Sequence, residues 1–161
     1  IAEPVDWVGI NYYTRKLIAP DGTDQFPALK EVEGPLPKTL MDWEIYPEGL
    51  DFFMRRVHED YAQGLPIYIT ENGMASPDVV KDGAVPDPDR IQFLNAHLAK
   101  VHKAVEDGLP IKGYFIWSLL DNYEWALGYE KRFGLVHVDF DTLSRRPKAS
   151  WHALKEALKA E

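Results

Sequence analysis

Short runs of apolar, β-branched and aromatic residues recur along the chain and predict β-strands. These runs span residues 5–13, 66–70, 111–117 and 135–140. Their composition is typical of buried strands. The first two runs are followed by long segments rich in Pro and Gly, residues 14–46 and 71–88. Loops of that length usually carry function or cover a site.

Three other segments place apolar residues at three- and four-residue steps, the spacing of one face of an amphipathic helix. The first starts at Pro47 and ends near Gly64, the second starts at Asp89 and ends near Gly108, and the third starts at Pro147. Proline suits a first helical turn, and glycine suits the position after a helix ends. The residues predicted to face inward are Leu50, Phe53, Met54, Val57 and Tyr61, then Ile91, Leu94, Leu98, Val101 and Val105, and finally Trp151, Leu154 and Leu158.

Strands that alternate with helices of this length indicate βαβ units and a parallel sheet, so the predicted fold class is α/β. The chain has 161 residues, enough for one domain or part of one. Three main strands with a long loop after each carboxyl end favour a portion of a (β/α)8 TIM barrel over a complete doubly wound sheet. Residues 1–161 are therefore expected to be one segment of a single barrel domain.

Composition narrows the classes of partner. The formal charge of −8 argues against binding to nucleic acid or to an anionic membrane, both of which need a cationic surface. With no cysteine, the chain has neither disulfides nor thiolate metal sites. The segment begins without a basic region or a long apolar stretch, so no targeting peptide is visible and a cytoplasmic location is favoured. A neutral or cationic small molecule is the expected ligand.

In a barrel the active site gathers where the strands end, and three clusters of polar and aromatic residues stand there. They span residues 11–14, 70–73 and 117–125. Glu71 is the strongest candidate for a catalytic residue, because a carboxylate on a rigid strand end can be held against the anomeric carbon of a sugar. From spacing alone, an exposed glutamate in a turn is an equally good interpretation.

The clusters resemble motifs of one known family. Residues 67–73, Ile-Tyr-Ile-Thr-Glu-Asn-Gly, are similar to the nucleophile signature of glycoside hydrolase family 1. Residues 8–14 resemble its sixth barrel strand, residues 42–50 the segment that enters its sixth helix, and residues 117–125 with 132–135 its eighth strand and sugar-recognition loop. The likeness covers essentially the whole chain in the right order and implies the carboxyl-terminal part of the barrel, strands six to eight.

The resemblance implies a retaining β-glycosidase of the β-glucosidase type. Glu71 would attack the anomeric carbon and form a covalent glycosyl-enzyme intermediate. Tyr13 would donate its hydroxyl to that carboxylate, favour its charged form and orient it. Glu124 would accept hydrogen bonds from the 4- and 6-hydroxyls of the sugar, and the Trp125 indole would donate to the 3-hydroxyl.

Other aromatic and amide residues receive less specific roles from the same resemblance. Trp117 would lie beneath the sugar ring and Phe133 would line the same subsite, with plain core packing as the rival interpretation. Asn11 would position Tyr13 or a sugar hydroxyl, although an asparagine here is as often a turn former. Trp43 would stack on the leaving-group side. No cofactor is implied, and the histidines show no metal-binding spacing.

A related branch of the family cleaves 6-phospho-β-glycosides, and its phosphate-binding site resembles a set of three residues, Ser, Lys and Tyr. Glu124 stands where that serine would be, Lys131 is shared, and Phe133 replaces the tyrosine. A carboxylate would repel the phosphate dianion, so a non-phosphorylated sugar is predicted.

Retaining hydrolysis needs a second carboxyl, and family members carry it in an Asn-Glu-Pro motif after the fourth strand. These residues do not contain that motif. An amino-terminal fragment of the same enzyme is therefore the expected partner, beside a small-molecule glycoside. The alternative is a non-catalytic half-barrel that acts only as a binding or folding module. Thioglycosidase activity and the choice among glucose, galactose and fucose stay open.

Overall fold

The computed structural model describes residues 3–62 and 64–159. Its strands are β1 Val8–Asn11, β2 Leu17–Pro20, β3 Leu29–Val32, β4 Ile67–Asn72, β5 Ile111–Ile116, β6 Val136–Val138 and β7 Arg145–Pro147. Its helices are α1 Pro47–Val57, α2 Pro88–Glu106 and α3 Ala149–Ala157, with a π-helical turn η1 His58–Ala62 and a 3-10 turn η2 Trp125–Leu127. The predicted strands and helices are all present, with shorter bounds for the first and last strands.

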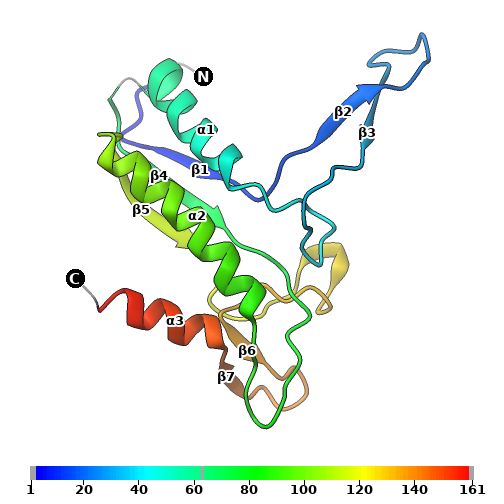
Figure 1. The fold of residues 1–161 in the computed structure, drawn as a ribbon, viewed down its shortest axis with the longest axis vertical. Coiled ribbons are helices and arrows are strands. Elements are labelled where there is room, and N and C mark those ends of the chain that lie inside the picture. Colours follow the sequence, from blue (N-terminus) through cyan, green and yellow to red (C-terminus); the bar gives the residue numbers. More distant parts are fainter. Residues whose placement is uncertain (1–2, 63, 160–161) are drawn as a thin grey trace.

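A three-stranded parallel sheet in the order β1-β4-β5 organises the chain. Helices α1 and α2 lie together on one face of this sheet, as Figure 1 shows. The connections β1-α1-β4 and β4-α2-β5 are βαβ units, so the prediction of parallel strands joined by helices is confirmed. All three strands end at the same edge of the sheet.

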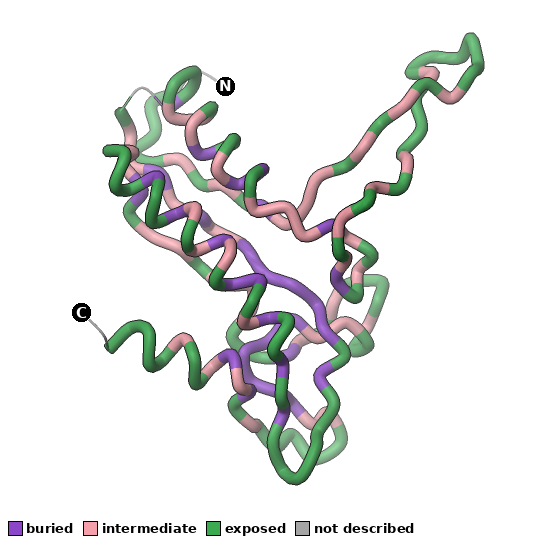
Figure 2. The backbone as a smooth tube through the Cα atoms, in the orientation of Figure 1, coloured by how far each residue is buried: buried purple, intermediate pink, exposed green. Residues whose placement is uncertain are grey.

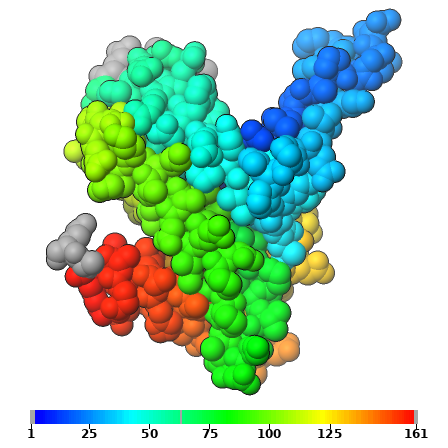
Figure 3. Space-filling view, in the orientation of Figure 1, coloured from blue at the N-terminus to red at the C-terminus, as the bar shows by residue number. Residues whose placement is uncertain are grey.

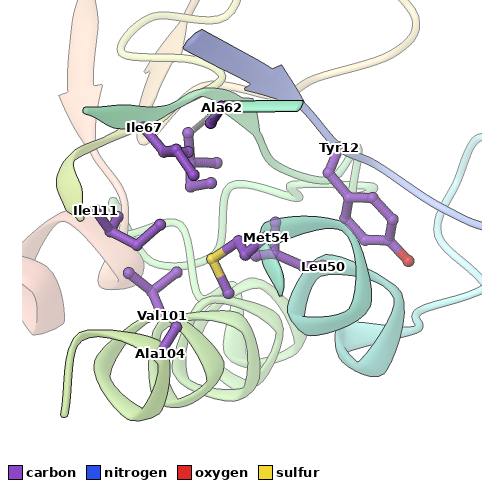
Figure 4. Packing of buried hydrophobic residues seen from close by; sticks show 9 residues of the cluster. Tyr12, Leu50, Met54, Ala62, Ile67, Val101, Ala104 and Ile111 are labelled. Atoms are coloured by element: carbon purple, nitrogen blue, oxygen red, sulfur yellow. The ribbon is translucent and has the colours of Figure 1, made fainter. Parts of the chain in front are cut away.

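The main core lies between this sheet and the two helices (Figure 4). Ile67 and Ile69 of β4 face Leu50 and Met54 of α1, and all four are fully buried. Because side chains alternate along a strand, Tyr68 and Thr70 point to the opposite face. That face carries none of the helices.

The predicted inward stripe of α1 is wrong at two positions. Phe53 is 47% exposed and Tyr61 is 67% exposed, whereas Ala62 is fully buried. The helix passes into a π-helical turn at His58, and the wider turn moves the inward position from residue 61 to residue 62. In α2, the prediction that Val105 faces inward is also wrong. It is 48% exposed, because the buried face of the helix carries Val101 and Ala104 instead.

A second core cluster joins α2, α3 and the loop after β4. Met74, Phe93, Leu94 and Leu135 are its buried members, and Trp151 and Leu154 pack against it as predicted. The prediction for Leu158 is wrong, because this residue follows the last turn of α3 and is 71% exposed. Figure 2 shows that burial continues from the end of β4 into the next loop. Residues 72–76 are all buried.

Two hairpins complete the fold. Strands β2 and β3 form an antiparallel pair inside the segment 14–46, for which only a loop was predicted. This hairpin projects from the body of the molecule, as the space-filling view in Figure 3 shows. Strand β6 pairs with β7, also antiparallel. The second hairpin leads into α3.

Candidate active site

Seven of the eight predicted site residues line one pocket of about 210 Å³. They are Tyr13, Trp43, Glu71, Trp117, Glu124, Trp125 and Phe133. Tyr13, Glu71 and Trp117 come from the carboxyl ends of the three parallel strands, and the other four come from the loops that follow. The sheet edge where parallel strands end therefore carries the candidate site, as in other barrels.

Glu71 reaches this pocket because β4 loses its regular alternation near its end. Ile67 and Ile69 face the helices, and strict alternation would turn residue 71 the same way. The pairing of β4 with β1 shifts register after Ile10, and its pairing with β5 shifts between Ile69 and Asn72. As a result Asn72, not Glu71, is fully buried. Irregularities of this kind often redirect a side chain beside an active site.

The Tyr13 hydroxyl donates a hydrogen bond of 2.7 Å to Glu71 Oε2. Burial, this hydrogen bond and the negative charges of Glu71 and Glu124 raise the pKa of Tyr13. The phenol therefore stays protonated at neutral pH and acts as a donor. It fixes one carboxylate oxygen and leaves the other, Oε1, without a hydrogen-bond donor among the described residues.

Asn72 locks the end of β4, a role that the sequence did not indicate. Its amide nitrogen donates to the Tyr12 carbonyl at 2.7 Å, and its amide oxygen accepts from the Tyr114 hydroxyl. A buried amide with partners on both neighbouring strands holds the adjacent Glu71 in place. The sequence signal that could have indicated this role was a polar amide residue at the end of a predicted buried strand.

Gly73 is required by a close approach between two strand ends. An added Cβ would lie 1.8 Å from the carbonyl oxygen of Trp117. The neighbouring backbone is joined by a hydrogen bond of 2.9 Å from the Trp117 N–H to the Asn72 carbonyl. Only a residue without a side chain allows Glu71 and Trp117 to lie so near each other.

Three aromatic rings form one wall of the pocket. The ring of Tyr13 lies 5.4 Å from that of Trp43 and 6.2 Å from that of Phe133, measured between centroids. Trp43 and Phe133 are 6.3 Å apart. Phe133 is 1% exposed, so it supports the wall from behind, whereas Trp43 is half-buried. Flat apolar surfaces of this kind suit the faces of sugar rings.

Glu124 and Trp125 stand at the 3-10 turn η2 on the loop after β5. Glu124 Oε2 is buried and has no hydrogen-bond partner in the structure. Because an unpaired buried carboxylate oxygen is unfavourable, this atom is suited to accept a donor from a ligand. Trp125 is 81% exposed, which leaves its indole available.

Asn11 is the one predicted site residue outside this pocket. Its side-chain oxygen accepts a hydrogen bond of 2.6 Å from the Thr70 hydroxyl. It thus joins β1 to β4 one residue before Glu71 and does not contact Tyr13 through a hydrogen bond. Its role in sugar binding stays a prediction.

Residues 3–62 and 64–159 lack two other kinds of feature. These residues contain no group of three or more His, Asp or Glu side chains placed to hold a metal ion. Nor does this part of the chain form any helix with the length and apolar character needed to cross a membrane.

Comparison with known proteins bears on the sequence and the fold of the chain. The sequence model of Glycosyl hydrolase family 1 matches residues 1–161. The chain is 49% identical to Beta-glucosidase A of Thermotoga maritima over 156 residues, which cover 95% of this chain and 34% of that protein. It is 40% identical to the Bifunctional beta-D-glucosidase/beta-D-fucosidase of Bifidobacterium breve over 168 residues, covering 94% of this chain and 36% of that protein.

Solved structures give the same result. The family 1 β-glucosidase from Thermotoga maritima superimposes with a TM-score of 0.92 at 47% identity, covering 98% of this chain and 35% of that one. Another structure of it, in complex with isofagomine lactam, gives a TM-score of 0.91 at 46% identity with the same coverage. The chain therefore spans about a third of the length of these relatives and matches their carboxyl-terminal part.

Proposed function

This chain belongs to glycosyl hydrolase family 1, and from that premise we propose that it forms part of a retaining β-glycosidase with Glu71 as the nucleophile. The hydrogen bond between Tyr13 and Glu71 is the observation that carries the proposal. It holds one carboxylate oxygen at the wall of a pocket lined by aromatic rings. The free oxygen attacks the anomeric carbon as the glycosidic bond breaks, and the leaving oxygen takes a proton from the acid/base carboxyl. Water, deprotonated by that same carboxylate, then attacks the anomeric carbon and releases the sugar and Glu71.

The proposed substrate is a non-phosphorylated β-D-glucoside or a related glycoside. The unpaired Oε2 of Glu124 suits a hydroxyl donor, and a phosphate dianion there would be repelled. Lys131, which the phosphate-binding branch shares, instead donates to the Leu40 carbonyl at 3.0 Å. The names of the relatives, β-glucosidases and a β-glucosidase/β-fucosidase, support the same sugar class.

The remaining pocket residues take roles that fit their placement. Trp117 lies beneath the sugar ring, and Phe133 supports the same subsite from behind. Trp125 donates its indole N–H to the 3-hydroxyl. Trp43 offers a stacking face to the leaving group, where an aromatic surface tolerates many structures.

The acid/base carboxyl comes from the amino-terminal part of the enzyme. Glu71 and Glu124 are the carboxylates that line the described pocket, and Glu124 is assigned to sugar recognition. The sheet also needs further strands, because β1 and β5 are open edges within the described residues. On the face away from the helices, Trp7, Tyr68, Thr70 and Phe115 line an apolar hollow of about 310 Å³. Additional barrel strands would cover it.

The proposal is tested in a chimera that joins the amino-terminal part of the Thermotoga maritima Beta-glucosidase A to this chain. Incubation with an activated 2-deoxy-2-fluoroglucoside should trap the intermediate, and peptide mapping should place the label on Glu71. Glu71→Gln should abolish turnover, while Glu130→Gln, at an exposed position in the loop after β5, should leave it unchanged. A label on another residue, with Glu71 unmodified, would contradict the assignment of Glu71 as the nucleophile.

Two further measurements separate this proposal from its alternatives. The isolated chain should hydrolyse an aryl β-glucoside only in trace amounts, since general acid–base help is worth about two to four orders of magnitude. Complete inactivity of the chimera would favour a non-catalytic binding or folding module. Glu124→Ser should lose much more activity on a glucoside than on its 6-phosphate, and equal losses would refute the proposed discrimination.

A further inference from the structure

A buried network of charged side chains lies beneath the recognition loop, residues 118–135. This ion network consists of Asp78, Asp87, Arg90, Asp121, Arg132 and Lys148. Its three carboxylates and three basic groups balance in charge. The side chains are fully buried or nearly so, except that Arg132 is 21% exposed. None of the six lines the sugar pocket.

The network ties together segments that are far apart in the sequence. Arg90 of α2 donates to both oxygens of Asp78 at 2.8 and 2.7 Å. Lys148, just before α3, donates to Asp78 at 2.5 Å and to Asp121 at 2.7 Å. The loop after β4, the start of α3 and the loop after β5 therefore meet at one set of charges.

Asp121, near the start of the recognition loop, accepts hydrogen bonds from residues near the end of the loop and just beyond it. Its carboxylate accepts from the Gly134 N–H at 2.9 Å, from Arg132 at 2.7 Å and from the Val138 N–H at 3.3 Å. Arg90 also donates to the Arg132 carbonyl at 2.9 Å. These bonds fix the backbone on each side of Glu124 and Trp125, and immediately beside Phe133.

The tip of the loop is exposed but rests on aromatic contacts: the Tyr123 ring lies 5.2 Å from that of Tyr129, which lies 4.1 Å from that of Phe140. Trp125 is 81% exposed and Tyr123 is 61% exposed. Local backbone bonds, such as the one of 2.7 Å from the Glu124 N–H to the Gly128 carbonyl, shape the turn, and Lys131 joins the loop to the Leu40 carbonyl at 3.0 Å. The bonds at the base of the loop act together with these contacts to set the direction in which Glu124 points.

We propose that the ion network is a positioning device for sugar discrimination, with Asp121 and Arg132 as positioning residues that act through Glu124 and Phe133. The proposal rests on the function proposed above. Buried ion pairs are poor sources of stability compared with apolar packing, because desolvation opposes their attraction. Their directional bonds, however, allow few alternative arrangements of the chain, which suits a loop that must hold a carboxylate in one place.

The test compares two sugars in the chimera. A nitrophenyl β-glucoside offers a 6-hydroxyl to Glu124, whereas the matching β-xyloside lacks the hydroxymethyl group. In Arg132→Gln, kcat/KM should fall on the glucoside by up to about 100-fold, the size expected for a 1 Å misplacement. The loss on the xyloside should be markedly smaller, so the ratio of the two kcat/KM values falls.

Control variants separate positioning from stability. Arg56→Gln removes an exposed ion pair with Asp60 on α1 and η1 and should leave the ratio unchanged. Arg132→Lys keeps the charge and should restore part of the ratio. Asp121→Asn, if it folds, should show a larger loss than Arg132→Gln. Reduced melting temperature with an unchanged sugar ratio would mean that the network only stabilises the fold.

Hydrogen exchange provides a measurement that does not depend on activity. Peptides covering residues 118–135 should exchange faster in Arg132→Gln than in the parent chimera, and Arg56→Gln should match the parent. Equal exchange in all three would overturn the positioning role. An inactive parent chimera with faster exchange in Arg132→Gln would refute the proposed enzyme function but keep the structural role of the network.

Discussion

A methyl group at residue 73 tests how strictly the site depends on the close contact between the ends of β4 and β5. The Cβ of an alanine there would lie 1.8 Å from the Trp117 carbonyl oxygen, whereas contacts below 3.0 Å are essentially never seen. The two backbones must therefore separate by at least about 1.2 Å, the difference between these distances. The obstacle is backbone, which cannot turn aside as a flexible side chain could.

The size of the effect follows from that displacement. Overpacking of this kind costs about 1–3 kcal/mol of unfolding free energy, and loss of the Trp117–Asn72 backbone hydrogen bond adds about 1 kcal/mol. Glu71 lies two residues before the substituted position, so the proposed nucleophile moves as well. A misplacement of about 1 Å can reduce a rate by about 100-fold. Gly73→Ala should therefore lower kcat/KM far more than its stability loss alone explains.

The assay measures kcat/KM on a nitrophenyl β-glucoside in the chimera, together with the free energy of unfolding in denaturant. Gly83→Ala is the matched control, because Gly83 has a φ of +78° and open space around it. Alanine there is strained by about 1–2 kcal/mol but contacts no part of the pocket. It should lose stability and keep activity. A Gly73→Ala variant with the kcat/KM of the parent would refute the reasoning.

Two further predictions concern Tyr13 and His97. Tyr13→Phe removes a hydrogen bond to a charged group, worth about 1.5–3 kcal/mol; it should lower kcat about 10- to 100-fold and also lower the melting temperature by a few degrees. Burial lowers the pKa of His97 from its usual 6.5, so the unfolded chain binds this proton more readily and stability falls as pH drops below about 6.5. Chemical denaturation should show a smaller loss between about pH 7.5 and pH 5 in His97→Gln; identical losses would contradict this assignment.

The sequence predicted the sheet and most of the pocket because both depend on local patterns. Each apolar run gave a strand, and parallel strands joined by helices must end at one edge. That rule placed Tyr13, Glu71 and Trp117 at one edge, since each stands where a run ends, but it left an exposed turn glutamate as an equally good interpretation of Glu71, and the roles of all three came from the family resemblance. The family resemblance then supplied the loop residues Glu124 and Trp125, which no periodicity would have selected.

The features that were missed depend on tertiary contacts. The π-helical turn that buries Ala62 in place of Tyr61 reflects packing at the end of α1, and a helical pattern of constant period does not contain it. The hairpin of β2 and β3 lies in a segment whose prolines and glycines indicated only a loop. The register shift that redirects Glu71 is likewise a property of pairing with neighbouring strands.

The contacts made inside this segment indicate which parts of the proposed reaction its own residues could support. Tyr13 is bonded to the proposed nucleophile Glu71, the Trp117 N–H is bonded to the Asn72 carbonyl beside it, and Asp121 is bonded to Arg132 and Gly134 in the loop bearing Glu124. These bonds contribute to the geometry of the proposed sugar-recognition residues. Protonation of the leaving group cannot be fixed in the same way, because that carboxyl must be placed relative to Glu71 across the barrel mouth. Under the proposed function, turnover therefore depends on closing the barrel, even though this segment carries the proposed nucleophile and Glu124.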